Sequence, residues 1–390
     1  MSVTFAGAQQ SSTESGEPQT TRYVYLGKHY PELPPLSLLE EILTDEGIQG
    51  ARLSNQGNNF MGRLLGREFV LDEARVPERA NVVAKAKEIL DQGHRFIVAD
   101  LEPQDLLAVA DLPKARNAII ANIRASDDRL RQEQCRANVL HMIPSRVMRA
   151  DALAQYLTWK RWSRWFLVTG KKPEDIAYAR AVKRAAERFG AEIVAERSYQ
   201  LETGARRVET GHQQIQTQMP MLTRGAPEHD VVFAADEMES FGLYLLFRTA
   251  EPRPVVGTHG LVATAWHRSF EQYGGMSVQN SFEEFAGRDM TERDYLAWLA
   301  IKMFAEAVVR TGSDDVARVR DYLLADEFKL AGYKGSGMNF RAWDQQLRQP
   351  TLISGPQALV SMAPLEGFLH PTYLTDTLGF DEAESECEFD

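Results

Sequence analysis

Apolar runs alternate with amphipathic stretches along most of the chain. In residues 141–196, a helical stretch leads into the apolar run WFLVTG at 165–170, and a second helical stretch leads into AEIVAE at 191–196. Short apolar runs separated by helices are typical of parallel strands in a sheet whose faces are covered by helices. The pattern therefore predicts an α/β protein whose binding residues follow the carboxyl ends of the strands.

The same alternation predicts the elements on either side of that region. Before it, we expect strands at 22–27, 51–54, 96–100, 117–122 and 138–143, and helices at 35–46, 63–74, 81–90, 103–112 and 127–137. After it, we expect strands at 230–236, 254–260 and 276–282, and helices at 239–250, 263–275, 290–311 and 315–326. Thr291 is the expected N-cap of the longest helix, which Gly312 ends. From Phe328 onward, turn glycines between short apolar pieces predict an appended hairpin.

Composition and charge narrow the classes of function. The chain has 390 residues, enough for roughly two or three domains, and 44% of them are hydrophobic. Its formal net charge of −11 argues against general nucleic-acid binding and mildly favours a cationic or neutral ligand. No apolar run reaches the roughly 18 residues that a membrane span needs. Residues 1–21 are polar and lack the apolar core of a signal peptide, so we expect a disordered leader there.

The sequence lacks the common catalytic and nucleotide-binding motifs. It has no GxSxG elbow, no GxGxxG after the first expected strand, no GxxxxGK[ST], no HExxH and no CxxC. A catalytic triad can be dispersed along a sequence, so this absence is moderate support for a binding protein rather than an enzyme.

Polar residues at the expected strand ends are the candidates for ligand contacts. In the first half they are Asn55, Asn58 and Asn59 in a loop at 55–62, then Asp100, Glu102 and Arg124. In the second half they are Tyr178, Asp236, Glu237, Glu239 and His259. An arginine at such a position could grip a carboxylate, and a tyrosine could stack on a ligand. The competing interpretations are turn formation by the asparagines, helix capping by the carboxylates, and structural roles for the tyrosine and the histidine.

Asp236, Glu237 and Glu239 form the densest acidic cluster among these candidates. Clustered oxygen ligands suit a hard cation such as Ca²⁺ or a lanthanide ion, and they also suit an amine. Carboxylates are equally common in the first turn of a helix, where they interact favourably with its dipole. A bound metal ion is therefore one of two interpretations, and no other cofactor is expected.

Cys135 and Cys387 are the two cysteines, and they lie far apart in sequence. Two buried free thiols would be typical of a cytosolic protein, whereas a disulfide would indicate an oxidising compartment. Cys387 lies in the acidic stretch DEAESECEFD, where a free thiol has no packing role. The residues alone leave both alternatives open.

Several longer segments indicate a family. They are CRANVLHMIPSR, GHQQIQTQMPMLTRG, FAADEMESFG, TAWHR, FRAWDQQLRQP and PTYLTDTLGF. With these segments and this order of strands and helices, the chain resembles type I periplasmic solute-binding proteins of ABC transporters. More narrowly, it resembles the branch associated with PQQ-dependent alcohol dehydrogenase systems. The resemblance covers about residues 22–387.

This resemblance implies two Rossmann-like lobes with parallel sheets, joined by three crossovers, and a ligand cleft between the lobes. The first lobe would comprise residues 22–143 and 286–327, the second lobe residues 144–285 and 328–365, and an acidic C-terminal tail residues 366–390. The resemblance also implies a disulfide between Cys135 and Cys387.

The resemblance further implies a monomeric receptor in the periplasm, after removal of a signal peptide, that delivers its ligand to a membrane permease and its ATPase. The ligand would be a small metabolite of alcohol oxidation or a lanthanide species. An amino acid is disfavoured, because the Ser/Thr pairs and glycines that hold amino acids in related receptors are not obvious here. Two alternatives use the same cleft: a ligand sensor or metal chaperone without transport, and an enzyme on a binding-protein scaffold.

Overall fold

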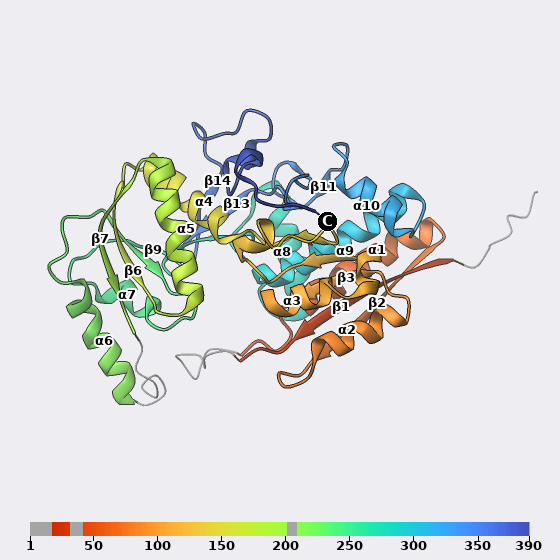
Figure 1. The fold of residues 1–390 in the computed structure, drawn as a ribbon, viewed down its shortest axis with the longest axis horizontal. Coiled ribbons are helices and arrows are strands. Elements are labelled where there is room, and N and C mark those ends of the chain that lie inside the picture. Colours follow the sequence, from red (N-terminus) through yellow and green to blue (C-terminus); the bar gives the residue numbers. More distant parts are fainter. Residues whose placement is uncertain (1–17, 32–41, 201–208, 390) are drawn as a thin grey trace, which may run out of the picture.

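Two lobes lie side by side, each built on a mainly parallel sheet with helices on both faces (Figure 1). The computed structural model describes residues 18–31, 42–200 and 209–389. It confirms the expected α/β class with two lobes. The helix expected from Pro35 falls largely outside the described residues. None of the helices in the described part of the chain has the length and apolar character that a membrane span requires.

The first lobe contains a five-stranded parallel sheet in the order β2-β1-β3-β4-β5. Its strands are β1 (Gln19–Lys28), β2 (Arg67–Val76), β3 (Phe96–Asp100), β4 (Ile119–Asn122) and β5 (Val139–His141). Alternate side chains of β1 enter different cores, because successive residues of a strand point to opposite faces. Tyr23 and Tyr25 lie in one core, and Val24 and Leu26 lie in the other.

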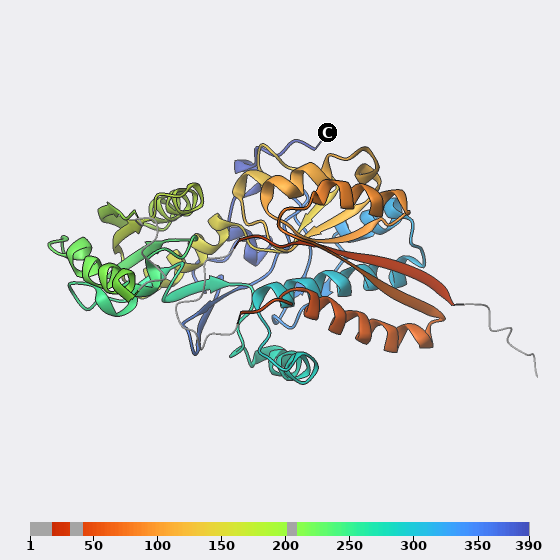
Figure 2. The same cartoon turned by 90° about the horizontal axis from the view of Figure 1, so that it is seen from below.

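Among the described residues, six helices cover the two faces of this sheet. The core around Tyr23 is closed by α1 (Ile48–Leu64), α8 (Gly275–Ala286), α9 (Glu292–Thr311) and α10 (Val316–Leu324). The core around Val24 is closed by α2 (Val82–Asp91) and α3 (Pro103–Ala110). The chain therefore returns to this lobe after building the other one, as Figure 2 also shows.

The second lobe contains a seven-stranded sheet in the order β14-β13-β10-β9-β8-β6-β7. The strands are β6 (Arg164–Thr169), β7 (Glu192–Ser198), β8 (Val231–Ala235), β9 (Val255–Gly257), β10 (Leu261–Thr264), β13 (Thr351–Ser354) and β14 (Leu359–Ala363). Its helices are α4 (Arg146–Trp159), α5 (Pro173–Phe189), α6 (Glu209–Thr223) and α7 (Gly242–Arg248). β13 and β14 run antiparallel to their neighbours, and the other five strands are parallel.

The chain passes between the lobes after β5, after β10 and before β13. Buried side chains tie these three crossovers together. The Lys334 ammonium donates hydrogen bonds to the carbonyls of Ala265 and Pro350, which belong to the second and third crossovers. The Gln349 amide donates to the carbonyl of Met142 in the first crossover. We call this junction the hinge.

Three expected segments near the start of the chain are wrong. The expected strand 51–54 and loop 55–62 form one helix, α1, and the expected helix 63–74 consists largely of strand β2. The face of α1 that meets α9 carries small side chains, and a Cβ on Gly50 would lie 1.8 Å from the Asp294 carbonyl oxygen. Close helix packing through small residues leaves no apolar stripe in the sequence, which is the signal for an amphipathic helix.

Two further expected elements, both after β9, are wrong. Residues 263–275, expected as a helix, include the end of β10 and a 3₁₀ turn at Gln272–Gly274. Residues 276–282, expected as a strand, lie in α8, where Val278 and Phe282 are buried on one face. The expected helix 127–137 is only a 3₁₀ turn at Asp128–Arg131.

The ends of the lobes also differ from the expected organisation. β1 begins at Gln19, so residues 19–21 belong to the sheet rather than to a leader. In the expected acidic tail, Asp376 and Leu378 are buried, so that part is not a solvated end. The division of the chain into lobes stays a proposal. The packing of Phe282, Phe340 and Leu347 in the first core favours placing α8 and residues 328–347 with the first lobe.

Candidate ligand-binding site

A cavity of about 940 Å³ lies between the lobes. It lies where the carboxyl ends of β3 and β4 face those of β8 and β9, which is where open α/β sheets place their ligands. Seven of the expected contact residues line it, namely Glu102, Arg124, Tyr178, Asp236, Glu237, Glu239 and His259.

Arg124 forms part of the wall on the first lobe. Its Nη1 lies 3.3 Å from Asp100 Oδ1, and its guanidinium lies 4.8 Å from the centre of the Tyr30 ring. Asp100 itself lies behind the cavity wall, where it accepts a hydrogen bond of 2.8 Å from the Tyr25 hydroxyl. Asp100 therefore orients an arginine of the wall, which differs from the direct ligand contact expected for it.

Glu102 lies two residues after Asp100, directly before α3, at the mouth of the cavity. Burial raises the pKa of Glu102 above its ordinary value, Arg124 opposes this change, and the nearby carboxylates of Asp105 and Glu174 add to it. Glu174 lies in the first turn of α5, on the second lobe. Like charges from opposite lobes thus face each other across the opening, where a cationic group would relieve their repulsion.

Asp236 has a structural role in the wall on the second lobe. Its buried carboxylate accepts backbone hydrogen bonds of 2.6–2.8 Å from Ser240, Phe241 and Gly242, where α7 begins. A carboxylate at the start of a helix satisfies N–H groups that have no partner within the helix. The capping interpretation of Asp236 is therefore the one that the geometry supports.

Glu237 belongs to an ion-pair network that sequence reasoning missed. Arg146, the first residue of α4, lies 2.7 Å from Glu237 and 2.6 Å from Asp127 of the first lobe. Burial raises the pKa of Glu237, and Arg146 and Arg149 oppose this change. This network joins a loop after β8 to a loop after β4, so it spans the two lobes.

Arg149 and Glu292 form a second pair that was not expected. Arg149 Nη2 lies 2.7 Å from Glu292 Oε2, and Glu292 also accepts a hydrogen bond from the Ala265 amide in the second crossover. Burial alone would raise the pKa of Glu292, but Arg149 and the Ala265 N–H hold it below its ordinary value. The cavity wall is thereby connected to the hinge.

Tyr178 and His259 lie on the second-lobe side as expected. Tyr178 is 2% exposed and packs beside Phe233, and the described residues offer its hydroxyl no hydrogen bond, so this group is available to a ligand. His259 Nδ1 lies 3.0 Å from the Thr258 hydroxyl. A Cβ on Gly242 would lie 2.2 Å from His259 Nδ1, so glycine leaves the space that the imidazole occupies.

Asn55, Asn58 and Asn59 lie on α1 and not in a loop at a strand end as expected, and they do not line this cavity. Asn59 exchanges two hydrogen bonds with the backbone of Phe69, and Asn58 donates to the carbonyl of Ile301. These amides fix α1 to β2 and to α9. Their error follows from the incorrect loop assignment.

A signal for the missed arginines was present in the sequence. Arg146 and Arg149 lie in the first turn or so of α4, next to the N-cap Ser145. Positive charge at the N-terminus of a helix opposes the helix dipole, so two arginines there require carboxylates from elsewhere. Asp127, Glu237 and Glu292 supply that charge.

The described residues contain no group of three or more His, Cys, Asp or Glu side chains that could hold a metal ion. Asp236, Glu237 and Glu239 therefore do not form the expected metal cluster. Asp236 caps a helix, Glu237 pairs with Arg146, and Glu239 has a left-handed backbone with φ of 51°. The oxygens of Asp236 and Glu237 have other partners, and the three carboxylates form no group that could hold a metal ion, which overturns the metal-site interpretation.

The comparisons with known proteins now decide the family. The family model described as periplasmic binding protein matches residues 58–354, which is most of the chain. The chain belongs to the periplasmic binding protein family. Membership in a family of binding proteins agrees with the expectation that this protein is not an enzyme. None of the curated proteins matches it.

Solved structures with the same fold match almost the whole chain. A branched-chain amino acid ABC transporter periplasmic ligand-binding protein from Burkholderia xenovorans is 14% identical, with 95% of this chain and 99% of that chain covered and a TM-score of 0.72. A leucine-, isoleucine-, valine-, threonine- and alanine-binding protein from Brucella ovis, in a closed conformation, is 13% identical, with 96% and 100% covered and a TM-score of 0.70. An ABC transporter solute-binding protein from R. palustris, in complex with benzoate, is 13% identical, with 94% and 99% covered and a TM-score of 0.65. At these identities the likeness establishes the fold.

Proposed function

We propose that this periplasmic binding protein is the solute receptor of an ABC transporter and captures a small organic ligand between its lobes. The observation that carries the proposal is the cavity at the facing carboxyl ends of both sheets, lined by charged side chains from each lobe. The related structures support it, because two are described as ABC transporter binding proteins and the third is named for the amino acids it binds.

Capture follows from the connection between the wall and the hinge. Arg146 and Arg149 lie at the start of α4, directly after the first crossover, and their partners come from both lobes. A ligand that replaces some of these ionic contacts stabilises one lobe arrangement over another. It can shift the equilibrium only by the difference in its affinity for the two arrangements. The ligand-bound form is then recognised by a membrane permease with its ATPase.

The chemistry of the cavity favours a small polar solute. Arginines and carboxylates both line it, and the Tyr178 hydroxyl adds an uncommitted donor. The repulsion between Glu102 and Glu174 favours a ligand with a cationic group near the mouth. A bare metal ion fits less well, since the described carboxylates do not converge.

We further propose that the ligand belongs to PQQ-dependent alcohol oxidation and that the receptor acts as a periplasmic monomer. The support for this narrower statement is the resemblance carried by the segments CRANVLHMIPSR, FAADEMESFG and PTYLTDTLGF. The first segment contains Arg146 and the second contains Asp236 and Glu237, so both contribute to the cavity wall.

A thermal-shift titration of the purified, metal-stripped protein tests the receptor role. The panel contains small alcohols and aldehydes, small carboxylates including benzoate, amines, amino acids, Ca²⁺ and La³⁺. A ligand at about 100 times its dissociation constant adds about 2.7 kcal/mol of stability, which is readily visible as a rise in Tm. We expect a rise with an organic solute. A rise with La³⁺ and with no organic solute would contradict the organic ligand.

A cavity-filling variant locates the bound ligand. Ser126 lines the cavity, so Ser126→Trp is expected to abolish the ligand-induced rise in Tm. Ser277 is exposed on α8, so Ser277→Trp serves as the matched control and should retain the rise. A full response in Ser126→Trp would show that the ligand binds elsewhere.

A further inference from the structure

The C-terminal strap, which we define as residues 378–389, starts on the second lobe. Leu378 lies in the second-lobe core with α4 and α5. The Gly379 amide donates to Asp151 at 2.9 Å, and its carbonyl accepts from Arg188 at 2.7 Å. Asp151 is completely buried, so this attachment has little freedom to move.

The attachment to the second lobe continues along α5. The Arg184 guanidinium lies 4.6 Å from the centre of the Phe380 ring, and its Nη2 lies 2.8 Å from both carboxylate oxygens of Glu384. A stacked and ion-paired arginine holds both an apolar and a charged neighbour. The strap is therefore bound to α5 as far as Glu384.

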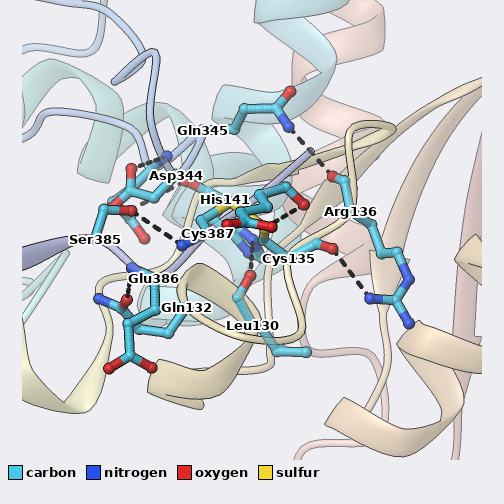
Figure 3. The surroundings of a disulfide bond; sticks show 12 residues. Leu130, Gln132, Cys135, Arg136, His141, Asp344, Gln345, Ser385, Glu386 and Cys387 are labelled. Atoms are coloured by element: carbon cyan, nitrogen blue, oxygen red, sulfur yellow. Dashed lines mark hydrogen bonds between the residues drawn. A yellow bond between two sulfur atoms is a disulfide. The ribbon is translucent and has the colours of Figure 1, made fainter. Parts of the chain in front are cut away.

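The end of the strap is bound to the first lobe. A disulfide joins Cys387 to Cys135 across 252 residues of sequence, which confirms the pairing implied by the resemblance. The Glu386 amide donates to the Gln132 side chain beside it. Figure 3 shows the disulfide next to Gln132 and His141, a residue of β5. The anchor on the first lobe is thus covalent.

The strap crosses a second gap between the lobes. A cavity of about 520 Å³ lies there, lined by Gln132 of the first lobe, Arg184 of the second lobe, and Glu384 and Glu386 of the strap. Arg146 lines both this cavity and the ligand cavity. Arg146 therefore lies between the two cavities.

We propose that the C-terminal strap is a fourth connection between the lobes and limits how far the ligand cleft can open. The three crossovers form the hinge, and a covalent tie beside them removes rotations that the crossovers alone allow. If the lobes are held near the arrangement that binds ligand, fewer molecules are in open forms, and the apparent affinity for the ligand is reduced less. The acidic tail then restricts the movement of the two lobes relative to each other.

The consequence for ligand capture rests on the proposed function, but the limit on opening does not. Small-angle X-ray scattering of the ligand-free protein measures opening through the radius of gyration and needs no ligand. The proposed limit on opening can therefore be wrong while the proposed receptor role is right. A ligand screen without a hit would not change the interpretation of the scattering result.

The test compares native protein with the double variant Cys135→Ser, Cys387→Ser. We expect a larger radius of gyration in the double variant. Val319→Ala is the control, because Val319 is buried in α10 on the first lobe and its truncation lowers stability without touching the strap. Val319→Ala should keep the native radius. An unchanged radius in the serine variant, or an equal increase in the control, would overturn the proposal.

A second measurement tests the same limit if the serine variant does not fold. The folded native protein is reduced with a phosphine, and a thiol titration verifies that both cysteines are free. The radius of gyration of this reduced protein is then compared with that of the oxidised protein. An increase supports the limit on opening, and no change contradicts it.

Discussion

The hinge and the cavity both contain arginines and carboxylates, but these regions differ in how completely the charged side chains are paired and enclosed. Near the third crossover, the Asp376 carboxylate is 2% exposed and lies 3.0 Å from Arg341 and 2.9 Å from Arg348. At the cavity mouth, Glu102 is exposed and no described residue forms an ion pair with it. The same residue types therefore occur in two different dielectric environments.

This difference in enclosure explains how the hinge can keep one arrangement of its charged side chains while the cavity can change its arrangement when a ligand binds. A buried charge that loses its partner pays the full cost of desolvation, so the hinge pairs hold a single arrangement. A charge at the cavity mouth can be solvated by water until a ligand arrives, so its partners can be exchanged at little cost. Substitutions at the hinge should therefore change mainly the free energy of unfolding, and substitutions at the cavity should change mainly the affinity for the ligand.

The largest effect is expected at Asp376. Asp376→Asn removes a charge shared by Arg348 and by Arg341, a fully buried arginine whose other carboxylate partner is Asp344. Breaking a buried ion pair by changing one partner costs roughly 3 kcal/mol or more. We expect a loss of that size in the free energy of unfolding, measured by urea denaturation.

An exposed pair provides the control for Asp376. Arg22 and Asp72 are paired at 3.2 Å, with 54% and 40% of their side chains exposed. Asp72→Asn should change the free energy of unfolding by less than about 1 kcal/mol, as exposed pairs do. Equal losses in the two variants would remove the contrast between enclosed and exposed pairs.

A smaller effect, which depends on pH, is expected at Lys334 in the hinge. Burial lowers the pKa of Lys334 from 10.5 to about 7, while Glu292 opposes this change and Arg149 adds to it. The Tyr295 ring also faces the amine. Between about pH 7 and the ordinary lysine pKa, the unfolded chain binds a proton that the folded chain does not. Stability should therefore rise with pH in this window, by up to about 1.4 kcal/mol per unit.

The comparison of native protein with Lys334→Met isolates this contribution. We expect the difference between their free energies of unfolding to move in favour of the native protein from pH 7 to pH 9. Lys329→Met removes an exposed lysine and should show no such change across the same range. A pH-independent difference for Lys334→Met would mean that its carbonyl partners keep the amine charged.

These contrasts also show what the sequence could predict. The parallel strands of both lobes have apolar runs that any α/β pattern would reveal, and Thr291 and Gly312 do begin and end α9. The pattern failed where packing uses small or charged residues. α1 packs against α9 through Gly50 and Ala51. The exposed residues of edge strand β2 give this strand a sequence pattern like that of a helix. The local sequence does not show which neighbouring helix or strand will bury such a face.

The site was predictable to the extent that it depends on strand ends. Glu102, Arg124 and His259 could be found because each follows a recognisable strand, and all three line the cavity. Arg146 and Glu292 could not be assigned in this way, because each lies at the start of a helix and pairs with a residue of the other lobe. Only the three-dimensional path of the chain brings those charges together.

The smallest effect on stability, with a clear effect on binding, is expected at Tyr178. Tyr178→Phe keeps the packing beside Phe233 and removes only the hydroxyl that faces the cavity. Because that hydroxyl has no hydrogen bond among the described residues, its loss should change the free energy of unfolding by less than about 0.5 kcal/mol. A ligand that accepts or donates a hydrogen bond there should bind about three- to tenfold more weakly, since such a bond contributes about 1 kcal/mol.

Tyr322→Phe is the matched control for this last effect, because Tyr322 lies on α10, beside Phe328 and outside the cavity. Isothermal titration with the first ligand found in the solute panel should give the native dissociation constant for Tyr322→Phe. Unchanged affinity in Tyr178→Phe would mean that the ligand leaves the tyrosine hydroxyl unused. Recognition would then rest on the exchangeable charges of the wall, and Glu102→Gln should weaken binding more than Tyr178→Phe does.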